Sequence, residues 1–521
     1  MKSRSARAAA IDFTVAQPLW NYVPDGFRQE ELPILKRGVR INVLFSGFNE
    51  FSREAFRYLA SCVQFLAPEG NNRFGYADTY GEKRGGLADC GGKKGEEFGK
   101  ERKDRFVPFA IDYFAFCDEK TADAAEAEFE KGFYRYRDFL SDVGRNADKS
   151  AVSSKNAGEA VGKSADEYLP VAPMPFSFSF IRGKNRGGVA DKLENLSESG
   201  KPSLNIVFIG NEKLADDDED ERRVREAAEK ISARLRDSSG SGDPSGSDDS
   251  GNLFGSGDSK KAEEKFRTVV FRLTDGRWKC VYDSFPESFG KKCVGSEISD
   301  GRGFAGGVFG FEKVEDECER VRRFAAYRNA LYIKEKQKRE GKFVPFEEIL
   351  EKTLGEAGDA LGDDRQSVCA FSGLVFYCAA LGLAVVKDEN QKICPKIVGS
   401  NGGIGKEAFA KFREIFALCE HYRWNACMIT DGYVPAKKQE ILRGIRTVGG
   451  KGVYTNGTDK ETKKHGNLTT FSGLDLFADM ISERDGVSAE KADVKAFDAQ
   501  LIDDADELFA FSGLKIVRIP R

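Results

Sequence analysis

The side chains best suited to chemistry lie in one C-terminal stretch of this 521-residue chain. The stretch contains both histidines of the protein, His421 and His465. Trp424 and Tyr433 offer rings on which a planar base can stack, and the guanidinium of Arg423 suits a phosphate or a carboxylate. Together these residue types predict a ligand-binding site.

Catalysis by the same residues is less well supported. Glu420 and His421 are adjacent, so on a helix their side chains point about a quarter turn or more apart, and no nucleophile accompanies them. A zinc site made of Cys419, His421 and His465 lacks a fourth ligand. We therefore expect no enzymatic activity and no metal. In a purely structural alternative, Trp424 packs in a core while Glu420 and His465 hydrogen-bond across it.

The same stretch resembles the RyR domain, a repeat first named from ryanodine receptors and also found in bacterial proteins. The family pattern is a helix with Glu-His-x-Arg-Trp, a Gly-Trp or Gly-Tyr pair, and a later His before an apolar pair. The resemblance covers about residues 365–521, with an extra loop at roughly 444–463, and implies a ligand-binding or regulatory module. Such modules are associated in bacteria with sensing nucleotide-derived signals and, when a channel is attached, with potassium transport. The residues that match the pattern, and so the implied ligand-binding residues, are Glu420, His421, Arg423, Trp424, Tyr433 and His465.

The N-terminal half shows an alternation of strand and helix patterns. This alternation predicts an α/β fold with a Rossmann-like doubly wound parallel sheet, whereas residues beyond 366 predict a mainly α-helical domain. The order is similar to that of the TrkA-N-type NAD-binding domain, which often precedes RyR domains in bacterial proteins. The expected strands are Arg40–Phe45, Val107–Phe116, Phe176–Ile181, Leu204–Ile209 and Arg267–Leu273, and the expected helices are Glu50–Leu66, Thr121–Leu140, Glu219–Leu235 and Glu315–Lys338.

A turn after the first expected strand stands where a Rossmann fold carries its G-x-G-x-x-G fingerprint. Only Gly47 is kept, and Asn49 and Ser52 replace the other two glycines. One interpretation is a cofactor site for NAD or a related nucleotide, with Gly47 and Asn49 at the turn and Asp112, at the end of the second strand, holding ribose hydroxyls. The other is a structural turn, because Asn tolerates a left-handed backbone and Ser can cap a helix.

A second glycine-rich segment, residues 402–406, has the sequence Gly-Gly-Ile-Gly-Lys. A phosphate-binding P-loop requires a glycine at position 400 and a Ser or Thr at position 407, where this chain has Ser400 and Glu407. We therefore expect no nucleotide hydrolysis here.

The chain divides into four expected parts. These are an irregular arm at 1–37, the Rossmann-like domain at 38–335, a polar connector at 336–365 and the RyR-like domain at 366–521. Within the Rossmann-like domain, segments rich in Gly, Lys, Asp and Ser predict polar insertions at about 68–106, 141–168, 183–202, 236–264 and 286–310. The insertions are either plain loops or tethers for a partner.

Composition excludes several classes of protein. With 81 Lys+Arg against 85 Asp+Glu the net charge is −4, so we expect no nucleic-acid partner. Eleven cysteines without a C-x-x-C pair predict reduced thiols in a cytoplasmic protein. Val368–Val386 is an uncharged run of 19 residues, close to the length of a membrane span. We interpret it instead as a buried helix from about Ser367 to Leu381, a stop at Gly382 and a short strand Leu383–Val386.

These observations favour a regulatory protein that binds a nucleotide or a nucleotide-derived metabolite, linked to ion-transport regulation or to defence signalling. The alternative is a protein-interaction adaptor with a structural RyR-like domain and no small-molecule ligand. The candidate partners are a nucleotide-like small molecule, a channel or effector protein, and a second copy of the chain.

Overall fold

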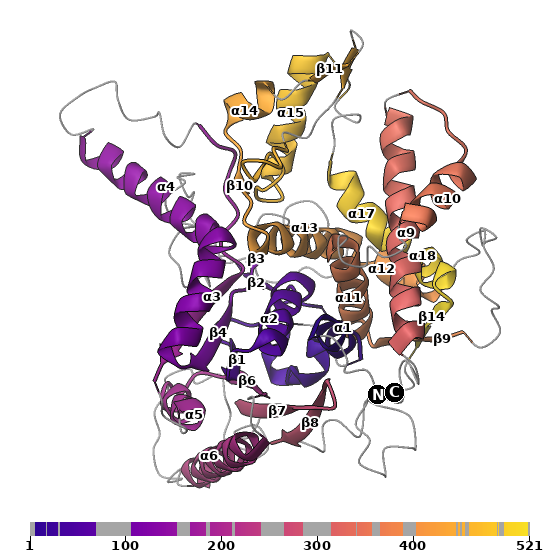
Figure 1. The fold of residues 1–521 in the computed structure, drawn as a ribbon. Coiled ribbons are helices and arrows are strands. Elements are labelled where there is room, and N and C mark those ends of the chain that lie inside the picture. The colour runs from indigo at the N-terminus through magenta and orange to yellow at the C-terminus, as the bar shows by residue number, and fades with distance from the viewer. Residues whose placement is uncertain are drawn as a thin grey trace, which may run out of the picture.

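The computed structural model divides into a sheet region and a largely helical C-terminal region (Figure 1). The predicted insertion at 286–310 and most of those at 68–106 and 236–264 lie outside the described residues. The insertion predicted at 141–168 was wrong in its first part, which is helical as far as Ser153, and its residues 154–166 lie outside the described residues. The structure describes residues 6–16, 18–29, 32–68, 106–153, 167–183, 188–210, 214–240, 265–284, 314–339, 341–356, 365–388, 403–443, 446–448, 451–453, 458–486, 488 and 494–518.

A six-stranded sheet forms the core of the N-terminal region, in the order β5-β4-β1-β6-β7-β8. The first five strands are parallel, and β8 runs antiparallel to β7 after a tight turn at Asp275 and Gly276, both with positive φ. This is the strand order of a doubly wound sheet, which confirms the predicted fold class with β8 as a departure from an all-parallel sheet. The strands are β1 (Arg40–Ser46), β4 (Ile111–Cys117), β5 (Phe176–Arg182), β6 (Ser203–Ile209), β7 (Phe266–Thr274) and β8 (Arg277–Asp283).

The central strands are apolar along most of their length because helices cover both faces of the sheet. One face, with Val43 and Phe45, packs against α2 (Glu50–Cys62) and α3 (Glu119–Lys131). The other, with Leu44, packs against α5 (Gly188–Glu198) and α6 (Leu214–Gly240).

Two helix predictions in this region were wrong. Thr121–Leu140 is two helices, α3 and α4 (Tyr134–Ser153), because the chain breaks at Gly132, where a Cβ would lie 3.3 Å from the Thr430 carbonyl oxygen. Helix α5 falls in the segment 183–202 that was expected to be a polar insertion. It forms because its buried residues recur at helical spacing: Val189, Leu193 and Leu196.

The N-terminal arm is not irregular throughout. Helix α1 (Ala6–Ala16) is rich in alanine, the best helix former, and packs on α2. Two short 3₁₀ helices, Leu19–Tyr22 and Asp25–Phe27, follow it. Trp20 of the first lies 6.2 Å, between ring centroids, from Phe376 of the helical region, so the arm joins the common core.

The helical region begins earlier than expected. Helix α9 (Val314–Arg339) packs on α10 (Phe346–Glu356) and on α11 (Arg365–Ala380), so it belongs to this region and not to the sheet domain, and α10 lies in the predicted connector. The other elements are α12 (Ile404–Ala410), α13 (Arg413–Thr430), α14 (Lys438–Arg443), α15 (Gly473–Asp485), α17 (Lys495–Asp503), α18 (Ala505–Phe511), and the paired strands β2 (Leu66–Pro68) with β3 (Phe106–Pro108), β9 (Leu383–Lys387) with β14 (Leu514–Arg518), β10 (Val434–Pro435) with β13 (Lys464–His465), and β11 (Arg446–Val448) with β12 (Lys451–Val453).

The long uncharged run folds as predicted. Its helical part, α11, is buried almost all round, the chain reverses at Gly382 with φ +69°, and β9 follows. Within the described ranges, no helix combines the length and the apolar character needed to cross a membrane. Helices α11 and α13 both pack on α2, so the two regions share one apolar core.

Candidate functional site

Helix α13 carries Glu420 and Arg423 at the contact with the sheet region. Arg423 Nε and Nη2 donate to the two carboxylate oxygens of Glu420 at 2.6 and 2.8 Å. Arg423 Nη1 donates to the carbonyl of Ser61 near the end of α2 at 3.1 Å. The side chains are 0% and 2% exposed, so the guanidinium that was expected to hold a ligand's phosphate is engaged by the protein itself.

The surroundings of this pair are built to hold it. Gly373 of α11 leaves room for the arginine, because a Cβ there would lie 2.7 Å from Arg423 Cδ. Arg328 of α9 is a second cation, 3.9 Å from Glu420. Burial alone would lower the pKa of Arg423, but the Glu420 carboxylate outweighs burial and raises that pKa well above its usual value. Arg423 therefore keeps its positive charge beside the Glu420 carboxylate.

His421 joins α13 to two other segments. Its Nε2 lies 2.8 Å from the carbonyl oxygen of Thr469, and its Nδ1 lies 3.3 Å from a carboxylate oxygen of Asp498 on α17. Because a carbonyl only accepts, we assign a proton to Nε2. Its Nδ1 faces Asp498, whose pKa is raised by burial although the contact with His421 lowers it.

Trp424, Tyr433 and His465 form a group that we call the aromatic cluster. The ring centroid of His465 lies 4.8 Å from that of Trp424 and 6.3 Å from that of Tyr433, both edge to face, an arrangement that aromatic rings favour. His465 is 4% exposed, whereas Trp424 and Tyr433 are partly exposed. Of the six predicted ligand-binding residues, these two have side chains that reach the surface.

The strands β10 and β13 bring Tyr433 and His465 together, because Val434 and Pro435 pair with Lys464 and His465. The backbone N–H of Asn467 donates to His465 Nδ1 at 3.1 Å, so the ring proton sits on Nε2. Burial lowers the pKa of His465 to about 3. The ring is therefore neutral at physiological pH.

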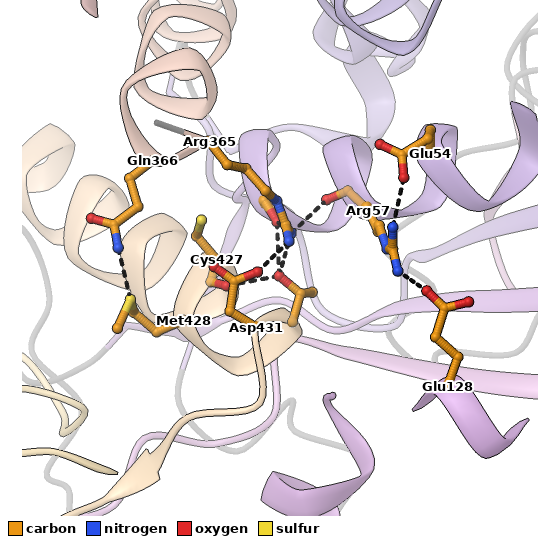
Figure 2. Close-up of polar contacts among 10 residues, drawn as sticks. Glu54, Arg57, Glu128, Arg365, Gln366, Cys427, Met428 and Asp431 are labelled. Atoms are coloured by element: carbon orange, nitrogen blue, oxygen red, sulfur yellow. Dashed lines mark hydrogen bonds and ion pairs between the residues drawn. The ribbon is translucent and has the colours of Figure 1, made fainter. Parts of the chain in front are cut away.

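The C-terminal end of α13 is clamped to the sheet region by Arg365 (Figure 2). Arg365 donates to Asp431 and to Thr430 at the end of α13, and to the hydroxyl of Ser61 on α2 at 2.7 Å. The clamp thus uses side chains from α11, α13 and α2, and Figure 2 shows it beside the chain of charges Glu54, Arg57 and Glu128.

Gly432 continues this contact. It has φ +83°, and a Cβ at this position would lie 2.4 Å from the carbonyl oxygen of Lys131 at the end of α3. Both facts require glycine. Tyr433 is the next residue, so the aromatic cluster begins where the two regions touch. The loop that carries His465 also touches the sheet region, since Arg135 donates to the Thr462 carbonyl at 3.0 Å.

The turn after β1 lies at the carboxyl edge of the sheet, beside the point where the strand order reverses. Gly47 has φ +78°, and its N–H donates to Phe116 O at 3.0 Å. The side chain of Asn49 accepts from the N–H of Ser52 at 3.2 Å and donates to the Gly210 carbonyl at 2.6 Å. The turn keeps its Rossmann position, while the polar groups expected to meet a pyrophosphate bind neighbouring segments of the chain.

Asp112 does not lie at this edge, and its predicted place was wrong. It is the second residue of β4, because the strand begins at Ile111 after the separate short strand β3. Its partner in the register is Asn42 of β1, near the amino edge of the sheet, and its carboxylate accepts from Ser177 Oγ at 2.8 Å. Asp112 and Gly47 therefore cannot hold one dinucleotide in the Rossmann manner.

The glycine-rich segment before α12 is closed by a carboxylate of the protein. Asp506 of α18 accepts from the N–H groups of Gly405 and Lys406 at 3.1 and 2.6 Å. Glycine is needed because a Cβ at Gly403 would lie 2.2 Å from this carboxylate. The segment docks α12 on α18.

In the part of the chain that the structure describes, no group of three or more His, Cys, Asp or Glu side chains could hold a metal ion. The cysteines described there are free thiols. Two residues of the site were missed from the sequence: Asp498, which is separated from His421 by 77 positions (498 − 421), and Lys463. Lys463 lies two residues before His465 in the chain, and this proximity is the signal that could have found it.

Comparison of the chain with protein-family models, curated proteins and solved structures gives no match.

Proposed function

We propose that this chain is a regulatory protein that binds a planar, nucleotide-type ligand on the aromatic cluster and passes its presence to the sheet region through α13. The observation that carries the proposal is the position of the two partly exposed rings, one on α13 and one just after its end. Trp424 follows Arg423 directly, and Tyr433 lies two residues beyond Asp431. Each partly exposed ring therefore lies within two residues of a side chain that links the helical region to the sheet region or to its clamp.

The cluster has the chemistry for such a ligand. Stacking of a base on an aromatic side chain contributes about 1–3 kcal/mol, and the rings of Trp424 and Tyr433 are partly exposed. The neutral His465 between them offers its Nε2–H as a donor. The resemblance of these residues to the RyR pattern adds an independent reason to assign the ligand to this place.

The coupling follows from packing. Arg423 and Arg365 both bind Ser61 of α2, the first through the carbonyl and the second through the hydroxyl. A ligand that shifts Trp424 or Tyr433 displaces one of these contacts, because interfaces of this kind have discrete arrangements and do not deform continuously. We assign no cofactor to the turn after β1, and on the basis of the free thiols we propose a cytoplasmic location.

The test is a thermal-shift panel of NAD, ADP-ribose, ATP and cyclic nucleotides on the full-length protein. We expect at least one to raise the melting temperature, and we expect Trp424→Ala and Tyr433→Ala to abolish that shift. The matched control is Phe343→Ala, which removes a 94% exposed ring from the loop between α9 and α10 and leaves the shift intact. No shift with any compound, or a shift that survives both substitutions, would reject the proposal.

A protein-interaction adaptor is the second candidate. It is favoured by the burial of Glu420, His421 and Arg423, which are bound within the protein as a structural role requires. In this case native mass spectrometry of the freshly purified protein gives a complex with a second protein or a second copy and no retained small molecule. If the spectrum instead shows a bound small molecule with the mass of a nucleotide, the result supports the first proposal.

A further inference from the structure

Lys463 has an unusual backbone for a lysine. Its φ is +56°, a left-handed backbone conformation that residues other than glycine rarely adopt. Among the described residues one other non-glycine, Asp275, has a positive φ, and there the tight turn between β7 and β8 accounts for it. Strain of this kind persists where the surrounding structure fixes it, and it concentrates at functional sites.

The surrounding loop fixes Lys463 from both sides. Asp459 and Lys464 exchange two backbone hydrogen bonds of 2.9 Å, and the Asp459 carboxylate accepts from two further N–H groups of the turn. The Lys463 carbonyl accepts from the N–H of Val434 at 2.9 Å. The loop thus holds the backbone of Lys463 beside Val434, the residue that follows Tyr433.

The ammonium of Lys463 lies over the aromatic cluster, with Nζ 4.8 Å from the ring centroid of Tyr433. Neighbouring lysines have carboxylate partners: Lys464 pairs with Glu440, and Lys437 with Glu167 at 2.8 Å. In the described part of the chain Lys463 makes no ion pair. It is a cation held at the cluster with its charge uncompensated by a direct partner.

Two carboxylates act on the same ring. Burial first, and then Asp431 and Asp459, raise the pKa of Tyr433. Asp431 is bound by Arg365, and Asp459 is bound by Thr462 and the backbone of its own turn. Neither is an ion-pair partner of Lys463, so an incoming anion would meet an available ammonium.

We propose that Lys463 is the anion-binding residue of the aromatic cluster, and that the ligand is a planar ring carrying a phosphate or a carboxylate. The ring stacks on Trp424 or Tyr433, and the anion lies beside the Lys463 ammonium. The inference rests on the proposed function. It replaces Arg423, the residue that the sequence favoured for the anion, because Arg423 is buried against Glu420.

The test compares matched probes that differ in the anion: adenosine with AMP, and nicotinamide with nicotinate. Binding to the full-length protein is measured by calorimetry at low ionic strength. We expect the anionic member of a pair to bind at least tenfold more tightly, and this preference to fall to less than twofold in Lys463→Met. Lys463→Arg keeps the preference, and so does Lys460→Met, which removes an exposed cation from the same loop.

A third variant separates folding from binding. Lys463→Gly suits the positive φ, so we expect this protein to be folded and yet to lose the preference for the anion. If charged and uncharged probes bind alike, or if Lys463→Met keeps the preference, the assignment of Lys463 is wrong while the proposed function stands. If none of the four probes binds although a compound of the nucleotide panel does, this inference is wrong while the proposed function stands. If no compound of either set binds, both are rejected.

Discussion

The turn after β1 and the aromatic cluster after α13 are two places where residue types suggest a ligand, and the structure treats them differently. At the turn, Gly47, Asn49 and Ser52 bind neighbouring backbone or each other, and Ser46 donates to Asp220. At the cluster, the charged residues turn inward while two rings and Lys463 remain accessible in part. Gly47 and Asn49 at the turn are bound within the chain, whereas the cluster presents two partly exposed rings and an ammonium without an ion-pair partner among the described residues.

The same difference separates two tryptophans. Trp278 lies at the carboxyl edge of the sheet, is 2% exposed, and would be 3.0 Å from a Cβ at Gly210. Its ring packs on that of Phe208, with 4.9 Å between the ring centroids. Trp424 is partly exposed and lies edge to face with His465. Trp278 is therefore part of the core, whereas Trp424 can still contact a ligand.

The largest expected effect tests whether Arg423 is structural. Arg423→Met leaves the Glu420 carboxylate buried without its partner, so we expect the free energy of unfolding to fall by about 3–5 kcal/mol. The measurement is chemical denaturation followed by circular dichroism. The control is Arg413→Met on the same helix, which breaks an exposed pair with Asp503 and costs less than about 1 kcal/mol. Equal losses in the two variants would show that the buried pair is not a structural contact.

A second experiment compares alanine substitutions of the two tryptophans. Trp424→Ala is expected to weaken ligand binding by about 1–3 kcal/mol, the contribution of one stacked ring. Trp278→Ala is expected to lower the free energy of unfolding by roughly 3–5 kcal/mol, as for other large buried side chains, and to leave affinity unchanged in the folded fraction. Calorimetry and thermal melts of both proteins check this. Loss of affinity in Trp278→Ala would mean that the sheet edge takes part in binding.

A smaller effect is expected at the turn after β1. Asn49→Ala removes the cap of α2 and the bond to Gly210, which costs about 1 kcal/mol of stability. Asn49→Asp keeps a capping oxygen and is expected to recover part of the loss. Neither change should alter ligand affinity, and isothermal calorimetry on both variants provides the check. An affinity change in either one would reopen the turn as a cofactor site.

The smallest effect concerns pH. Because burial lowers the pKa of His465 to about 3, the ring stays neutral and its protonation should not change ligand affinity between pH 5 and 8. Stability behaves differently, since the unfolded chain takes up this proton near pH 6.5 while the folded chain does so only near 3. The His465 contribution therefore destabilises the fold progressively as pH falls below about 6.5. On acidification from pH 7 to pH 5 the melting temperature should fall more for the wild type than for His465→Gln. An affinity step near pH 6.5 that vanishes in His465→Gln would contradict the neutral assignment.

Much of the architecture was readable from the sequence because it depends on local patterns. The strands β1, β5, β6 and β7 lie within one or two residues of their predicted bounds, and the helix, glycine stop and strand of Val368–Val386 are as expected. The errors came where local signals were short. Helix α5 has three buried apolar residues in a polar segment, and β8 has one buried tryptophan.

For the candidate site, the sequence determined the residue types and their grouping: both histidines, Trp424 and Tyr433 belong to one arrangement that the fold brings together. Only the tertiary structure decided which of them face solvent. Arg423 is buried because α2 supplies a carbonyl and α11 a glycine at its side, and these lie 362 and 50 positions away in the chain (423 − 61 and 423 − 373). Lys463 remains unpaired among the described residues because a turn anchored by Asp459 holds it apart from the carboxylates that its neighbours use. Contacts between distant segments set burial and charge compensation, and no local pattern encodes them.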